Sequence, residues 1–286
     1  MATLQATLLA ICILLYAGLP GAAHAESAPQ RVVALGGVVT EIVYTLGQED
    51  RLVARDATST WPEEAEDLPD VGYVRALSPE GVLSVDPDLI LAIEGSGPPE
   101  TMDVLEAADI PLITVPEGHD AAAIRERIET VATALGVAEA GEALARDVET
   151  ALAAAVADAA GAVPPRVLFV LSMQGGRIMA AGDNTGAEGI IELAGGVNAM
   201  EGFEGYKQVS DEAVLLAAPD VILMMDRSGD HAADDAGIRA HPALGQTPAA
   251  EAGAIVRLPG LLMLGFGPRT PEAVRALSRA FEQVRS

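Results

Sequence analysis

"SPEGVLSVDPDLIL" (residues 78–91) and "SDEAVLLAAPDVIL" (residues 210–223) are two copies of one pattern, placed 132 residues apart. Serine is favoured just before a helix, and an acidic residue in the first helical turn interacts favourably with the helix dipole. Each copy therefore predicts a short helix after the serine and a buried strand after the Pro-Asp pair. A repeat at this spacing indicates two related halves built from the same helix–strand unit.

Other segments follow the same order of a short apolar strand and then a turn and a helix. Further apolar runs of this kind lie at residues 31–35, 111–115 and 166–171. Continuous apolar strands that alternate with helices are typical of parallel sheets covered on both faces. We therefore predict an α/β protein with two Rossmann-like lobes, each with a parallel central sheet.

The middle of the chain predicts a helical connection between these lobes. Residues 121–160 contain no proline and are interrupted by Gly136, which predicts two helices, the second at about 138–160. A helix of that length measures about 30 Å and could bridge two lobes or pack within one domain. The repeat favours the bridge, so we expect lobes at 26–137 and 164–286, joined by residues 138–163.

The N-terminal segment is typical of an exported protein. Residues 1–25 are apolar and end in the small-residue pattern Ala23-His24-Ala25, which predicts a signal peptide cleaved after Ala25. A Gly-Leu-Pro-Gly break within a short apolar run argues against a membrane anchor. Cys12, the single cysteine, falls in this segment, so disulfides and thiolate chemistry are not expected. We expect a soluble, monomeric protein of the periplasm.

Charge and motifs favour a binding protein over an enzyme. The formal net charge is −25, and residues 1–25 carry no Asp, Glu, Lys or Arg, so the acidic surface belongs to the exported part and argues against nucleic acid as a partner. The sequence has no Gly-x-Ser-x-Gly elbow and no phosphate-binding loop. No two of its histidines stand at metal-ligand spacing, so a zinc or manganese carrier is not expected either.

A tyrosine precedes each copy of the repeat, in the pairs Gly72-Tyr73 and Gly205-Tyr206. Ligands of open α/β sheets bind outside the carboxyl ends of the strands, so a cleft between two lobes is the expected site. A phenolate is an oxygen donor that can hold haem iron, and Arg75 near Tyr73 would favour the charged phenolate form. The residues alone leave open whether Tyr73 is a ligand or a packed aromatic.

Residues 56–62, 68–75 and 77–81 resemble the haem-carrier proteins of bacterial ABC-type haem importers, and the resemblance continues through residues 180–185, 194–199 and 264–271. That family has two α/β lobes joined by one long helix, a type shared with cobalamin and siderophore carriers. The resemblance implies that the chain binds ferric haem b and hands it to a membrane permease with its ATPase. It also implies that Tyr73 is the axial iron ligand and Arg75 its hydrogen-bonding partner.

The second lobe departs from the resemblance at one loop. Some relatives carry a histidine there, whereas residues 172–176 read Ser-Met-Gln-Gly-Gly. Met173 offers a thioether, which suits ferrous better than ferric iron, or it packs against the porphyrin. We expect Tyr206 to line the cleft opposite Tyr73 and Lys207 to meet a haem propionate, with a solvated lysine as the alternative. The sequence leaves open whether Lys207, Arg177, another cation or water meets the propionates.

Glu80 and Glu212 occupy equivalent positions in the two copies of the repeat. In the carriers that the chain resembles, one acidic residue per lobe docks into the permease, and the resemblance implies this role here. The alternative is that both glutamates only interact with helix dipoles. For the whole protein, the alternatives to a haem carrier are a ferric siderophore or cobalamin carrier and a periplasmic haem-processing enzyme.

Overall fold

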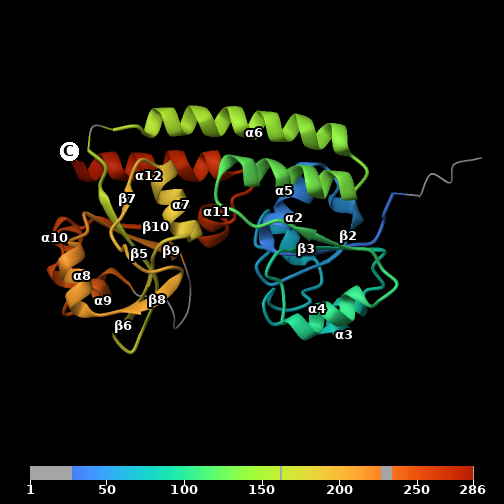
Figure 1. Cartoon of the computed structure of the whole chain (residues 1–286), viewed down its shortest axis with the longest axis horizontal. Helices are drawn as coiled ribbons and strands as arrows, with labels where there is room; N and C mark the ends of the chain where they lie inside the picture. The colour runs from blue at the N-terminus through green and yellow to red at the C-terminus, as the bar shows by residue number, and fades with distance from the viewer. Residues whose placement is uncertain (1–27, 162, 227–233, 286) are drawn as a thin grey trace, which may run out of the picture.

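The computed structural model describes residues 28–161, 163–226 and 234–285, and it contains two α/β lobes beneath one long helix (Figure 1). The α/β class and the two-lobe arrangement predicted from the repeat are confirmed. The predicted signal peptide lies outside the described residues. Among the described residues, the helices are too short or too polar to cross a membrane.

The N-terminal lobe is built on a four-stranded parallel sheet with the order β2-β1-β3-β4. Its strands are β1 (Val32–Leu35), β2 (Leu52–Arg55), β3 (Leu89–Ile93) and β4 (Leu112–Val115). Its helices are α2 (Gly37–Thr45), α3 (Pro79–Leu83), α4 (Pro99–Glu106) and α5 (Ala121–Ala134), with 3-10 turns η1 (Glu49–Arg51) and η2 (Glu63–Asp67). All four residues of β1 are buried, as expected of a central parallel strand.

The C-terminal lobe is built on a mixed sheet with the order β10-β9-β5-β6-β8, and β7 pairs with β5. Its strands are β5 (Arg166–Gln174), β6 (Arg177–Ala181), β7 (Val197–Asn198), β8 (Tyr206–Val209), β9 (Val221–Asp226) and β10 (Ile255–Pro259). Its helices are α7 (Gly186–Leu193), α8 (Asp211–Ala217), α9 (Asp235–Ala240), α10 (Pro248–Ala252), α11 (Gly260–Leu264) and α12 (Thr270–Arg285), with the 3-10 turn η3 (Leu244–Gln246).

The antiparallel strands β6 and β8 correct the prediction of a parallel sheet in this lobe. Gly175 and Gly176 have φ angles of 58° and 74°, the left-handed conformation that a two-residue hairpin turn requires. The chain therefore turns back on itself directly after β5 instead of crossing over through a helix. Strands β5, β9 and β10 are parallel, as predicted.

The serines of the repeat cap their helices as predicted. The Ser78 hydroxyl accepts a hydrogen bond from the Gly81 N–H at 3.1 Å, before α3. The Ser210 hydroxyl accepts one from the Ala213 N–H at 3.2 Å, before α8. The two copies therefore have the same local structure in the two lobes.

The aspartates of the repeat explain why a Pro-Asp pair stands before each strand. The Asp88 carboxylate accepts the Arg31 N–H at 2.9 Å, at the start of β1. The Asp220 carboxylate accepts the Arg166 N–H at 2.8 Å, at the start of β5. Each aspartate thus ties its own strand to the first strand of its lobe.

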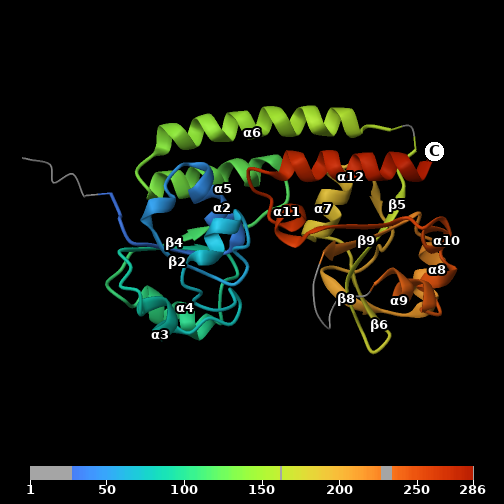
Figure 2. The same cartoon turned by 180° about the vertical axis from the view of Figure 1, so that it is seen from behind.

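The long helix α6 (Ala138–Ala159) bridges the lobes (Figures 1 and 2). Its 22 residues span roughly 33 Å, and it packs against α5 of the first lobe and α12 of the second. The largest cluster of buried apolar side chains accordingly runs through both lobes. This favours the bridging helix over two helices within one domain, while the residue boundaries of the lobes stay a prediction.

Candidate functional site

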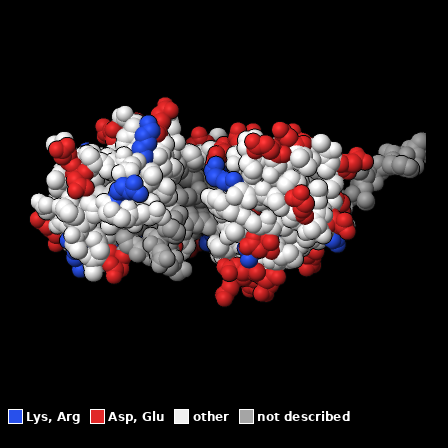
Figure 3. All heavy atoms as spheres, turned by 90° about the horizontal axis from the view of Figure 1, so that it is seen from below, with Lys and Arg blue, Asp and Glu red and all other residues white. Residues whose placement is uncertain are grey.

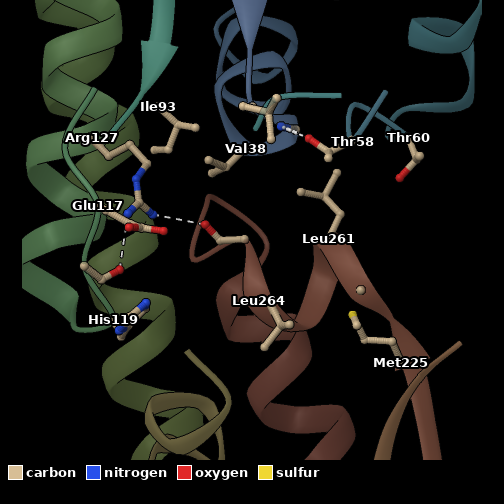
Figure 4. Close-up of a pocket in the computed structure, with 16 residues that line it drawn as sticks. Val38, Thr58, Thr60, Ile93, Glu117, His119, Arg127, Met225, Leu261 and Leu264 are labelled. Carbon is tan, nitrogen blue, oxygen red and sulfur yellow. Dashed lines mark hydrogen bonds between the residues drawn. The ribbon is translucent and has the colours of Figure 1, made fainter. Parts of the chain in front are cut away.

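A cavity of about 350 Å³ lies between the lobes, within the size range of small-molecule sites (Figure 4). From the first lobe, residues at or just after the carboxyl ends of all four strands reach it. From the second lobe, Met225 at the end of β9 and residues of α11 complete the wall. The cavity therefore lies where open α/β sheets bind their ligands. The first-lobe residues just described include Gly36, Thr58, Ile93 and Glu117.

The floor of the cleft depends on a close approach of backbone at Gly37. A Cβ atom at this position would lie 2.4 Å from the Thr58 carbonyl oxygen and 2.9 Å from a methyl group of Leu261. The Gly37 N–H also donates to the Thr58 hydroxyl at 2.9 Å. Only glycine fits here, where α2 begins against the second lobe.

Tyr73 lies on a short turn at this cleft, anchored by a buried neighbour. Val74 is 8% exposed and lines the cavity, whereas Tyr73 is 51% exposed. The Ala76 N–H donates to the Tyr73 carbonyl oxygen at 2.7 Å, which closes a β-turn. The turn therefore holds a free phenol at the cleft while Val74 fixes the backbone beneath it.

Arg75 lies on the same turn and pairs with Glu117. Its guanidinium is 3.7 Å from the Glu117 carboxylate, and it passes over Gly95, where a Cβ atom would lie 3.3 Å from Nη1. Among the described residues, no hydrogen bond joins Arg75 to Tyr73. The structure thus places Arg75 beside Tyr73, and its support of the phenolate stays a prediction.

Tyr206 begins β8 and faces the first lobe across the cleft. Burial raises the pKa of its phenol, and the Glu117 carboxylate raises it further, while hydrogen bonds to Ala187 and Thr185 and the charge of Arg75 oppose the rise. The Tyr206 phenol is therefore within electrostatic range of Arg75 and Glu117, two residues of the first lobe. The expectation that these two tyrosines belong to opposite walls agrees with this geometry, although their contact with a ligand stays a prediction.

The side chains of Met173 and Lys207 lie near a buried cluster of the second lobe and not on the face that carries Tyr206. Met173 packs against the cluster of buried side chains that includes Leu168 and Val170 in the second lobe. The Lys207 ammonium is 5.7 Å from the centre of the Phe203 ring, and Phe203 packs against the same cluster. The structure therefore does not bring these two predicted site residues to the surface that carries Tyr206.

Glu80 and Glu212 are exposed, on α3 and α8 respectively. Both helices lie on the side of their lobe away from α6, as the two opposite views show (Figures 1 and 2). Two carboxylates on one side of the molecule suit a partner that spans both lobes. Their docking role stays a prediction.

Glu117, which the residue patterns did not single out, also lines the cavity, and so does His119, for which the sequence favours a surface or capping role. Both follow β4 directly, so the rule that ligands bind beyond the carboxyl ends of strands was the signal that could have found them. The His119 ring centre is 5.1 Å from that of Phe266, so this loop packs against the second lobe. Burial lowers the pKa of His119, Glu117 opposes this, and Arg127 adds to it.

Acidification is expected to weaken the fold through His119. Because its pKa is lowered from 6.5 in the folded chain, its stabilising contribution is complete above pH 6.5 and is lost as the pH falls. Denaturant unfolding at pH 7.5 and 5.5 measures this loss. The variant His119→Gln, which does not titrate, should lose less stability between these two pH values than the wild type. An equal loss in both proteins would contradict this role.

Arg127 joins the two lobes although it has no carboxylate partner among the described residues. It is 1% exposed, and burial lowers its pKa. Its guanidinium donates to the Pro116 carbonyl at 2.9 Å in its own lobe. It also donates to the Gly265 carbonyl at 3.0 Å in the other lobe (Figure 4). The Gly118 and Phe266 carbonyls accept further bonds from it. Backbone from both lobes is therefore bound by one side chain.

A second tie between the lobes is the buried pair of Glu41 and Arg269. The Arg269 guanidinium is 2.8 Å from the Glu41 carboxylate, which also accepts the Arg269 N–H at 3.1 Å. Trp61 covers the guanidinium, with its ring centre 4.1 Å away. Burial raises the pKa of Glu41, and Arg269 opposes the rise. The two ties predict a stiff junction at the back of the cleft.

The lining of the cleft suits an apolar ligand. Among the described residues, no group of three or more His, Cys, Asp or Glu side chains is placed to hold a bare metal ion. The cavity is lined mostly by apolar side chains and glycines, and a free phenol stands beside it. Such a site can bind an apolar molecule and offer it one oxygen ligand.

Comparison with known proteins shows what this chain is similar to. The family model for periplasmic binding protein matches residues 32–261. The solved structure of periplasmic heme-binding protein BhuT in complex with two hemes is 42% identical, with a TM-score of 0.84, over 90% of this chain and 99% of that one. Periplasmic heme-binding protein RhuT from Roseiflexus sp. RS-1, in apo form, is 38% identical, with a TM-score of 0.86, over 90% and 99%. The vitamin B12-binding protein of Vibrio vulnificus is 30% identical over 70% of this chain and 72% of its own length.

Proposed function

Because the chain belongs to the periplasmic binding protein family, we propose that it binds haem between its two lobes and delivers it to an ABC importer. The observation that carries the proposal is Tyr73, a half-exposed phenol on a turn at the edge of an apolar interlobe cavity. The similarity to two haem-binding proteins over nine-tenths of the chain supports it. In this proposal the protein is a carrier and performs no chemistry on its cargo.

We assign the iron contact to Tyr73 and the stabilisation of its phenolate form to Arg75. A cation near a phenol favours the charged form. Arg75 lies two residues after Tyr73 on the same turn, and its guanidinium is 3.7 Å from the Glu117 carboxylate. Ferric haem b is the proposed form of the cargo, because an anionic oxygen donor suits ferric iron.

A cobalamin carrier is the second candidate, favoured by the 30% identity to a vitamin B12-binding protein. Titration of the purified protein with ferric haem and, separately, with cyanocobalamin distinguishes the two. We expect saturable haem binding at stoichiometric concentration, with the high-spin spectrum and charge-transfer band of a phenolate ligand. Tight cobalamin binding without haem binding would replace the proposal with the second candidate.

Docking is expected to depend on Glu80 and Glu212. The double variant Glu80→Lys/Glu212→Lys reverses one exposed charge on each lobe and should reduce haem uptake by a reconstituted importer by tenfold or more, as like-charge contacts cost several kcal/mol. Haem affinity should stay unchanged, because α3 and α8 do not line the cavity. The control Glu139→Lys/Glu142→Lys makes the same charge change on α6. Uptake that falls equally in both double variants would contradict a docking role.

A further inference from the structure

The two faces of the β6–β8 strand pair can be assigned from strand register. Cross-strand partners point to the same face, and successive residues of a strand point to opposite faces. Ala180 pairs with Lys207 and Ile178 with Val209, and the members of this set apart from Lys207 pack against one buried cluster. Lys207 therefore lies on the face of that cluster, which agrees with its position over Phe203.

The opposite face carries Tyr206 together with alternate residues of β6. Ala181 pairs with Tyr206 and Met179 with Gln208, so Met179 shares the face of Tyr206. Arg177 is two residues before Met179 and shares this face as well. The Tyr206 phenol lies beside Thr185 and Ala187 at the start of α7, and a Cβ atom on Gly186 between them would lie 3.3 Å from the His119 ring, so this face borders the first lobe.

A bulge in β5 explains why a simple alternation along that strand misplaces Met173. The pairing of β5 with β6 shifts between Val170 and Ser172, so Ser172 pairs with Met179 and Met173 pairs with Ile178. Met173 is thereby turned to the buried cluster, and Met179 is the methionine on the face of Tyr206. A bulge of this kind re-aims side chains by one position.

The turn of the β5–β6 hairpin, at Gly175 and Gly176, is held in place by a histidine from another part of the lobe. The His241 Nε2–H donates to the Gly176 carbonyl at 3.0 Å, and its Nδ1 accepts the Ala243 N–H at 3.2 Å. Arg177 follows Gly176 directly. The guanidinium is therefore carried by an anchored turn at the end of the cleft wall, and it is exposed.

Arg177 also differs from Arg75 in whether it forms an ion pair. Among the described residues no ion pair involves Arg177, whereas Arg75 is paired with Glu117. Viewed from below, Asp and Glu atoms lie on both lobes, and Lys and Arg atoms lie on the C-terminal lobe and at the edge of the N-terminal lobe beside the gap (Figure 3). In a chain of net charge −25, a cation without a carboxylate partner is a ready site for an anionic group.

We infer that the wall formed by Tyr206, Met179 and Arg177 contacts the macrocycle, and that Arg177, rather than Lys207, binds a propionate carboxylate of the haem. This inference rests on the proposed haem-carrier function. The wall runs from an aromatic ring through a thioether to a cation over four strand residues, roughly 13 Å. That order matches a planar apolar ring with carboxylates at one edge.

The test compares ferric haem with its dimethyl ester, which has the same iron and ring but no carboxylates. Arg177→Ala should weaken haem binding by about tenfold or more, the range of a charge-assisted hydrogen bond, and leave the ester unaffected. Lys207→Ala, the matched control on the other face of the paired strands β6 and β8, should change neither affinity. Thermal unfolding of both variants checks that each is folded.

Three results would overturn the assignment of Arg177 to a propionate. A loss of haem affinity in Lys207→Ala that equals or exceeds the loss in Arg177→Ala would overturn it, as would equal weakening of haem and ester by Arg177→Ala. Unchanged haem affinity in Arg177→Ala would overturn it too and would indicate propionates that face water. These results leave the carrier function intact, whereas a wild-type protein that binds no haem would remove the function itself.

Discussion

Tyr73→Phe is expected to weaken ferric haem binding by at least about 100-fold, or roughly 3 kcal/mol. The substitution removes one oxygen and leaves the ring, so the turn closed by the Ala76 N–H should persist. The phenolate is the proposed iron ligand, and without it the haem retains only apolar contacts and carboxylate contacts. Haem titration followed by absorption measures both the affinity and the loss of the phenolate charge-transfer band.

The matched control is Tyr206→Phe, which removes the same atom from the opposite wall of the cleft. Because burial raises the pKa of Tyr206, this phenol is held in its neutral form and is a poor anionic ligand. Its variant should keep the charge-transfer band and lose affinity only a few-fold. A band that survives in Tyr73→Phe and disappears in Tyr206→Phe would transfer the iron contact to the second lobe.

Glu41→Ala is expected to lower the free energy of unfolding by about 3–5 kcal/mol, the cost of breaking a buried ion pair. Its carboxylate is 3% exposed and accepts two bonds from Arg269, one from the guanidinium and one from the backbone. Removal of Glu41 leaves the Arg269 charge buried beneath Trp61 without its carboxylate. Urea unfolding, with the m-value compared between variants, measures the change.

A surface ion pair provides the control for this prediction. Glu142 and Arg146 form an exposed pair on α6 at 3.6 Å, and Glu142→Ala should cost less than about 1 kcal/mol. Similar losses in Glu41→Ala and Glu142→Ala would show that the interlobe pair contributes no more than a solvated one. Because the pair joins the lobes, the Glu41 variant should also become more susceptible to proteolysis near the loop that carries Arg269.

The sequence by itself determined the class and the internal symmetry of this protein. Local chemistry decides both features, since a serine caps the helix that follows it and an apolar run makes a buried strand wherever the chain places them. The prediction of a second helix at 138–160 agrees with α6 at Ala138–Ala159 for the same reason. Gly72 and Arg75 drew attention to Tyr73, but the residues alone left open whether it is a ligand or a packed aromatic, and the family resemblance supplied its proposed role.

Only the tertiary structure decided which side chains meet across the cleft. The partnership of Arg75 with Glu117 and the burial of Arg127 against carbonyls of both lobes join residues distant in sequence. The assignment of Met179 and Arg177, instead of Met173 and Lys207, to the face of Tyr206 depends on a bulge and on strand register. One residue of shift reverses a strand's faces, and pairing between strands, not local propensity, sets that shift.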